Sequence, residues 1–372
     1  MNCNESSKKL LILTQWLYLL YLILPQVKRS RYIYSILLLW ASLAIETRAQ
    51  SLSKFEFFGD DEIIECKLTS DFRFLRKEKF KTSYQPAEFI VYFANGDSAK
   101  TKVKIKARGN FRRKHCLFPP IKIKFPKVNF SESSIKEYNS LKLVTHCRSQ
   151  SSYTTRLFEE KLIYDMYNLM TPYSMRTRML KINYVDTGSK SSPGWNYGFL
   201  IEDIEQVAER NSAKEIKSQN VHMERLNRYF GTLFPTFEYM IGNTDWSVVS
   251  LHNIKLLREN NPELYQPIPV PYDFDYSGFV NAPYAIPPKL LGIESVTTRV
   301  YRGYCRTDDE FQEVFDQFIK KKDEIIALIS ESQLLDEKSK KKDSNYIMKF
   351  YDRIESQKFI SKTIMMECLT DK

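Results

Sequence analysis

The stretch "AEFIVYFANGDSAKTKVKIKAR", residues 87–108, decides the fold of the first half of the chain. Two runs of alternating residues flank a turn at 95–97, a pattern typical of a β-hairpin. In the second run, lysines alternate with Val103 and Ile105, so one face of the predicted sheet is apolar and the other is basic.

Further strands are predicted on both sides of one helix. The alternation resumes in "IKIKF" (121–125) and "LKLV" (141–144), and a second hairpin is predicted from "MRTRMLKINYVDT" (175–187) and "YGFLIED" (197–203). Between the strand at 141–144 and the second hairpin, apolar residues recur at helical spacing and predict a helix. Thr154 or Thr155 is its expected cap.

The second half of the chain is predicted to be mainly helical. Residues 205–220 are expected to form a surface connection, and a helix is expected over 224–241, where Pro235 should start or kink it. Short strands near 254–257 and 270–274 precede a helical, lysine-rich end. The order predicts an α+β fold with two lobes, a sheet-rich lobe over 50–203 and a mainly helical lobe over 204–372.

The first 49 residues differ in kind from the rest. Two apolar runs, Leu10–Leu24 and Ile33–Ile45, are both shorter than the ~20 residues of a membrane-spanning helix. A basic cluster before the second run and small residues after it, ending at Ala49, are typical of a secretory signal. We expect cleavage after Ala49 and export to the periplasm, the cell envelope or the medium.

The first apolar run is not needed by a cleaved signal. We interpret residues 1–26 as lying upstream of the true start of translation, which would be at Val27. The alternative is a protein tethered by one or two short membrane segments.

The charge of the chain is only mildly basic once the leader is removed. The first 49 residues hold six of the 56 basic and two of the 45 acidic residues, so the net charge is +7 rather than +11. No basic stripe interleaved with aromatic residues and no nucleic-acid motif is present, so we do not expect a nucleic-acid partner.

Export would place five cysteines in an oxidising space, where an odd number leaves at least one unpaired. Cys116 and Cys147 each follow a histidine, which suggests zinc. Adjacent ligands rarely reach one ion, however, so a Cys116–Cys147 disulfide or buried thiols are favoured over a metal site. The five are Cys66, Cys116, Cys147, Cys305 and Cys368.

Oxygen-bearing side chains gather in "GNTDWSVVSLHN" (242–253) and "PYDFDYSG" (271–278). Asn253, Asp273 and Asp275 are donors of the kind that Mg²⁺ prefers, and in an extended segment Asp273 and Asp275 would face the same side. Asp245 is placed to accept a proton from a substrate hydroxyl. The alternative is that these residues cap helices and close turns.

Several motifs, in this order, resemble the spore-coat-protein-H (CotH) family of atypical secreted protein kinases. The resemblance covers Arg108 to Gly278, about half of the mature chain. The motifs are "KARGNFRR", "PPIKIKF", "LVTHCRSQSSYTTRLFEEKLIYDMY", "MRTRMLKINYV", "YGFLIED", "IGNTDW" with "HN", and "PYDFDYSG".

The resemblance implies a two-lobed, atypical protein-kinase-like fold that binds ATP and Mg²⁺. Asp245 would be the catalytic aspartate, with Asn253, Asp273 and Asp275 as metal ligands. Nucleotide phosphates would be bound by Arg108, Gly109 and Asn110 in a loop and by Lys122 or Lys124 on a strand. Glu160 or Glu159, on the following helix, would hold that lysine, and Arg156 on the same helix is a further phosphate-binding or structural candidate.

The sequence departs from ordinary kinases in lacking G-x-G-x-x-G and H-R-D, and Asn253 follows Asp245 by eight residues instead of five. Two functions therefore fit it. One is an exported kinase that transfers the γ-phosphate of ATP to Ser or Thr hydroxyls of envelope or secreted proteins. The other is a non-catalytic cell-envelope structural or adhesion protein with a kinase-like fold.

Overall fold

The computed structural model describes residues 58–59, 62–93, 96–126, 140–356 and 358–370. These residues belong to one compact unit, Leu52–Lys372. With 37% of the chain helical and 25% in strands, the predicted α+β class is confirmed. The predicted leader, residues 1–49, lies outside the described residues.

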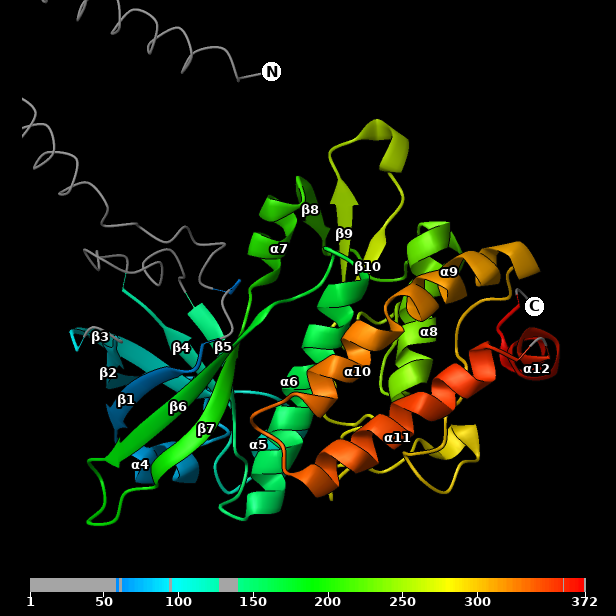
Figure 1. Ribbon diagram of the computed structural model, residues 1–372. Coiled ribbons are helices and arrows are strands. Elements are labelled where there is room, and N and C mark those ends of the chain that lie inside the picture. Colours follow the sequence, from blue (N-terminus) through cyan, green and yellow to red (C-terminus); the bar gives the residue numbers. More distant parts are fainter. Residues whose placement is uncertain (1–57, 60–61, 94–95, 127–139, 357, 371–372) are drawn as a thin grey trace, which may run out of the picture. The chain divides into compact units, whose positions relative to one another are not determined.

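Seven strands of the described chain form a closed barrel in the order β1-β2-β3-β4-β5-β7-β6 (Figure 1). Neighbours pair antiparallel except β1 and β6, whose parallel pairing closes the barrel. The strands are β1 (Ile64–Ser70), β2 (Gln85–Tyr92), β3 (Ser98–Ala107), β4 (Ile121–Lys124), β5 (Ser140–Thr145), β6 (Thr177–Asp186) and β7 (Gly194–Ile201).

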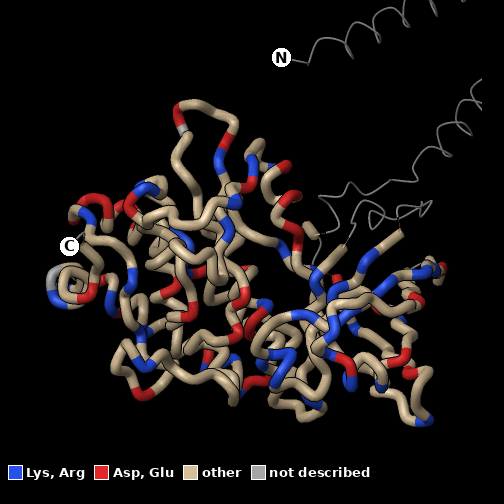
Figure 2. The backbone as a smooth tube through the Cα atoms, turned by 180° about the vertical axis from the view of Figure 1, so that it is seen from behind, with Lys and Arg blue, Asp and Glu red and all other residues tan. Residues whose placement is uncertain are grey.

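The hairpin predicted from the opening stretch is confirmed as β2 and β3. Val103 and Ile105 are buried in the barrel core, so the apolar face of the alternating pattern points inward. Basic positions are spaced along the barrel strands in Figure 2, in agreement with lysines on the outward face. A closed barrel of seven strands nevertheless differs from the usual N-lobe of a protein kinase.

Helices and a small sheet make up the other half (Figure 1). The central helix α6 (Ser151–Met170) contacts β6 and β7 on one side and α10 (Lys322–Ser330) on the other. The sheet has the order β10-β9-β8, formed by β8 (Ala213–Ile216), β9 (Ile254–Glu259) and β10 (Ile268–Pro271). Strand β10 directly precedes the segment that carries Asp273.

The remaining helices are short near the barrel, and the longer ones, α8 (Arg228–Ile241), α9 (Asp308–Lys320) and α11 (Glu337–Ile354), lie in the second half of the chain. Those near the barrel are α4 (Phe72–Lys77) and α5 (Phe111–His115). The others are α7 (Ile204–Arg210) and α12 (Met365–Glu367). Single turns of 3-10 helix lie at Met223–Arg225, Pro262–Leu264 and Lys289–Leu291, and a π-helix lies at Ile360–Ile364.

Three local predictions are wrong. Helix α6 begins at Ser151, so Thr155 lies inside it and its hydroxyl donates to the Ser151 carbonyl oxygen. The predicted surface connection at 205–220 holds α7 and β8. Helix α8 neither starts at Pro235 nor runs from residue 224: it begins at Arg228, because the Asn227 side chain caps it by accepting from the Phe230 N–H.

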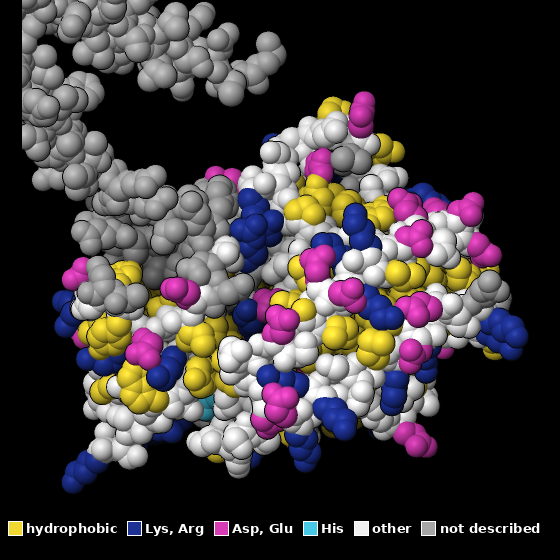
Figure 3. Space-filling view, viewed as in Figure 1, with side chains coloured by type: hydrophobic (Ala, Val, Ile, Leu, Met, Phe, Trp, Pro, Cys, Tyr) yellow, Lys and Arg dark blue, Asp and Glu magenta, His cyan; other side chains and the backbone are white. Residues whose placement is uncertain are grey.

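Disulfides join Cys116 to Cys147 and Cys305 to Cys368, and Cys66 is a buried free thiol. The favoured Cys116 and Cys147 pairing is therefore present. Within the described part of the chain, every helix is too short or too polar to cross a membrane. On the face shown in Figure 3, basic and acidic side chains are interspersed over the helical half.

Candidate active site

A hollow of about 430 Å³ is lined by predicted site residues from both halves. The barrel supplies the loop after β3 and Lys142 of β5, and the helical half supplies the segments around Asp245 and Asp273. Its polar lining consists of Arg108, Gly109, Asn110, Arg112, Lys142, Asp245, His252, Asn253, Asp273 and Asp275, with Tyr272 and Tyr276.

Asp245 follows the end of helix α8, which stops at Gly242. Gly242 has a φ of 66°, in the left-handed region that ends many helices. A Cβ added there would lie 2.1 Å from the Tyr346 hydroxyl oxygen, so only glycine fits. The chain therefore turns sharply after α8, and the N–H of Asp245 donates to Asn243 Oδ1 at 3.0 Å.

Both carboxylate oxygens of Asp245 have partners. His252 Nε2 lies 3.0 Å from Oδ1, and Asn253 Nδ2 donates to Oδ2 at 3.1 Å and to the Asp245 carbonyl oxygen at 2.7 Å. The hydrogen bond to Asp245 raises the pKa of His252, although partial burial opposes it. These bonds fix the orientation of the Asp245 carboxylate at the edge of the hollow, and about one third of the side chain stays exposed.

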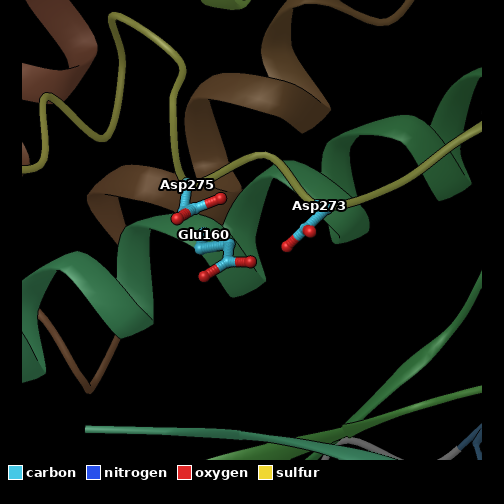
Figure 4. Close-up of side chains that lie close together, drawn as sticks. All are labelled: Glu160, Asp273 and Asp275. Atoms are coloured by element: carbon cyan, nitrogen blue, oxygen red, sulfur yellow. The ribbon is translucent and has the colours of Figure 1, made fainter. Parts of the chain in front are cut away.

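Asp273, Asp275 and Glu160 place their carboxylates around one point (Figure 4). One oxygen of each lies within 4.8 Å of the others. Glu160 comes from α6, and its side chain is buried together with that of Asp275, whereas Asp273 is half-buried. Phe274, between the two aspartates, is fully buried against Tyr164.

Arg112, on α5, is the counter-ion of this cluster. Its Nε donates to Asp275 Oδ2 at 2.7 Å and its Nη2 to Glu160 Oε2. Asp275 also accepts from the Tyr284 hydroxyl at 2.9 Å. One guanidinium therefore joins the barrel loop to α6 and to the segment after β10.

Two of the three carboxylates pair with this cation, and Asp273 lies close to them. Burial raises the pKa of both Glu160 and Asp275, and Arg112 only partly offsets it. Burial lowers the pKa of Arg112, but Asp275 and Glu160 outweigh it and keep the guanidinium charged. Burial thus disfavours the charged forms of Glu160 and Asp275, and a cation bound beside them would favour those charged forms.

The residues fit a divalent cation. Hard cations such as Mg²⁺ take carboxylate and amide oxygens, and Glu160 Oε1 is buried with no hydrogen-bond partner among the described residues. Glu160, Asp273 and Asp275 would hold the ion, and Asn253 lines the same hollow. Glu160 was predicted as a partner of a lysine and not as a metal ligand.

Lys142, on β5, is the lysine that reaches the hollow. Its Nζ lies 4.7 Å from the centre of the Tyr272 ring. Burial, and to a lesser extent Arg108, lower the pKa of Lys142 to about 8. Lys142 was not predicted as a site residue, because it lies between two core residues just as Lys122 does.

The loop Arg108–Asn110 lines the hollow as predicted from the resemblance. Gly109 has a φ of 81°, and the space around its α-carbon is open. Glycine is therefore required by the backbone conformation and not by crowding. Its open side leaves the loop backbone accessible from the hollow.

The other predicted phosphate-binding residues lie elsewhere. Lys122 and Lys124 line a separate hollow on the barrel. Arg156 donates to both oxygens of Glu159, at 2.9 and 2.8 Å, and Glu159 also pairs with Lys342 of α11. Of the two predicted glutamates, only Glu160 faces the carboxylate cluster.

Asn253 and Asp273 both have left-handed backbones, with φ of 55° and 67°. Non-glycine residues adopt this conformation infrequently, and such positions cluster at functional sites. The surrounding bonds hold them: Asn253 through Asp245, and Asp273 through its N–H, which donates to the Tyr164 hydroxyl oxygen at 2.9 Å.

Comparison with known proteins adds little. No protein-family model matches the chain, and no curated protein matches it. Among solved structures, the proinflammatory kinase CtkA of Helicobacter pylori aligns with 83% of this chain and 100% of its own, at 10% identity and a TM-score of 0.36. This likeness is too weak to assign a fold or an activity, so membership of the CotH family stays a prediction.

Proposed function

We propose that the protein is an exported, kinase-like phosphotransferase that moves the γ-phosphate of ATP to Ser or Thr hydroxyls of envelope or secreted proteins. One observation carries the proposal. An oriented carboxylate, a half-buried lysine and the two aspartates of a three-carboxylate cluster line one hollow, although they come from distant parts of the chain. Export rests on the signal-like pattern before residue 50.

Each group has a role in phosphoryl transfer. Asp245 accepts the proton of the substrate hydroxyl, whose oxygen forms a bond to the γ-phosphorus while the bond to the β,γ-bridging oxygen breaks and ADP leaves. His252 and Asn253 keep the Asp245 carboxylate in place. Magnesium, when bound at the carboxylates, neutralises phosphate charge.

Lys142 and the Arg108–Asn110 loop would bind the phosphates. A desolvated lysine attracts a phosphate oxygen strongly, because little solvent screens the two charges. Binding of a phosphate would also favour the charged form of Lys142, whose pKa burial has lowered to about 8. The loop adds the charge of Arg108 and the open backbone at Gly109.

The proposal is tested by nucleotide binding followed by phosphate transfer. We expect ATP with Mg²⁺ to raise the melting temperature, and Asp273→Asn to abolish that rise. Asp245→Asn should bind nucleotide normally and lose transfer by a factor of at least about 100. Glu263→Gln, an exposed position outside the hollow, is the control.

Two outcomes would contradict the proposal. If the folded protein does not bind nucleotide with Mg²⁺, the kinase function is wrong and the non-catalytic envelope function is favoured. Transfer that persists in Asp245→Asn would show that another residue accepts the proton.

A further inference from the structure

Arg302 lies against the loop that carries Asp245. Its Nη1 donates to the carbonyl oxygen of Thr244 and, at 3.0 Å, to that of Trp246. Its guanidinium carbon lies 4.8 Å from the centre of the Trp246 ring. One side chain therefore binds the carbonyl oxygens of the residues before and after Asp245.

The other contacts of Asp245 do not fix these two carbonyl groups. His252 and Asn253 bind its carboxylate and its own carbonyl oxygen, and Asn243 accepts its N–H. Without Arg302, the carbonyl groups of Thr244 and Trp246 would lose this charged donor, because no other described contact replaces it. The loop would keep the backbone bonds between Ser247 and His252 and the packing of Trp246 on Phe234, but these contacts leave the two carbonyl groups without a donor.

The segment that carries Arg302 is held by residues near the end of the chain, in addition to the contact of Tyr301 with Tyr239 of helix α8. Tyr301 N–H donates to Glu367 Oε2 at 2.5 Å, and Leu369 N–H donates to the Gly303 carbonyl oxygen at 2.8 Å. The disulfide between Cys305 and Cys368 closes the same contact. The last residues described thus hold the segment that carries Arg302.

We infer that Arg302 is a positioning residue, which fixes Asp245 at the hollow by clamping the two peptide carbonyls that flank it. The role of Asp245 rests on the proposed function, but the clamp itself does not. A small displacement of a reacting group can cost about 100-fold in rate. Loss of the clamp should therefore lower turnover without weakening nucleotide binding, since Asp273 and Lys142 do not contact Arg302.

Arg299 provides a matched control from the same segment. Its Nε donates to the Met240 carbonyl oxygen at 3.0 Å and its Nη2 to the Tyr346 carbonyl oxygen at 2.6 Å, so it makes the same kind of contact without touching the Asp245 loop. Arg299→Met should lower stability and leave turnover per folded molecule unchanged.

Hydrogen exchange tests the clamp independently of activity. The amides of Asp245, Ser247 and His252 are each bonded within the loop, at 3.0, 3.0 and 2.9 Å. In Arg302→Met we expect these amides to exchange at least about tenfold faster than in the native protein, and in Arg299→Met we expect no local change. Arg302→Lys, which keeps the charge but not the planar donors, should give an intermediate rate.

The kinetic arm separates positioning from a structural role. Arg302→Met should lower kcat by about 10- to 100-fold with KM for ATP within about twofold of the native value. Unchanged exchange in both Arg302 variants would overturn the inference, as would a loss of kcat equal to that of Arg299→Met. If the native protein transfers no phosphate, the proposed function fails, while the exchange rates still decide whether Arg302 holds the loop.

Discussion

Replacing Arg112 by methionine should destabilise the protein far more than removing a surface ion pair. The Arg112 side chain is 10% exposed, and its partners Glu160 and Asp275 are 1% and 8% exposed. Removing one partner of a buried pair costs about 3–5 kcal/mol, because the remaining charge is left uncompensated. Lys100→Met is the control, since Lys100 is 61% exposed in its pair with Glu88 and should cost at most about 1 kcal/mol.

Urea unfolding followed by circular dichroism measures both values at neutral pH. The effect should depend on pH, because the pKa values of Glu160 and Asp275 are already raised and would rise further without the guanidinium. Acids with raised folded pKa values bind more protons when folded, so stability falls as pH rises. The loss in Arg112→Met should therefore be smaller at pH 5 than at pH 8.

A second variant tests the cause. Arg112→Met combined with Glu160→Gln removes one uncompensated charge, so it should recover part of the lost free energy. The reasoning is refuted if Arg112→Met costs no more than Lys100→Met. It is also refuted if the loss is larger at pH 5 than at pH 8.

Two further predictions concern the helical half. Burial raises the pKa of Glu238 to about 8, so the contribution of Glu238 to stability declines as pH rises from about 4.5 to 8. In urea unfolding, Glu238→Gln should have the same unfolding free energy as the native protein near pH 4.5 and a larger one, by up to about 4 kcal/mol, at pH 8. Cys305 and Cys368 are 63 residues apart, so replacing both by serine should lower the unfolding free energy by about 4 kcal/mol, and an unchanged midpoint in urea would contradict this.

Local patterns predicted the strands, but not how the barrel closes. The alternation in β3 has one buried face, and such a pattern fixes which residues point inward. Closure depends on the parallel pairing of β1 with β6, in which Ile64 lies opposite Leu180. No local pattern encodes a pairing between residues so far apart in the sequence.

The carboxylates of Asp273 and Asp275 illustrate a correct expectation with a wrong reason. They were expected to face the same side because the segment would be extended. The structure instead gives Asp273 a left-handed backbone, yet the two carboxylates meet at Glu160 and Phe274 packs behind them. Two aspartates on either side of an apolar residue were enough to predict that their carboxylates lie together. The pattern did not predict the left-handed backbone of Asp273.

Arg112 and Lys142 were missed because their neighbours have the same chemistry. Arg112 lies in the run "RGNFRRKH", where sequence does not distinguish it from Arg113 or Lys114. Lys142 is one of many lysines on alternating strands, and only its burial against Tyr272 separates it from Lys122. Which basic residue enters the site is decided by tertiary packing.

Arg112 joins parts of the candidate site that lie far apart in the sequence. Arg112 is 48 residues from Glu160 and 163 residues from Asp275. Helix α5, which carries it, ends at Cys116, and the disulfide to Cys147 fixes that end next to the start of α6. Arg112 pairs with Glu160 and Asp275, so the two buried carboxylates are held together before any ligand binds. The hollow is therefore already shaped by contacts within the protein.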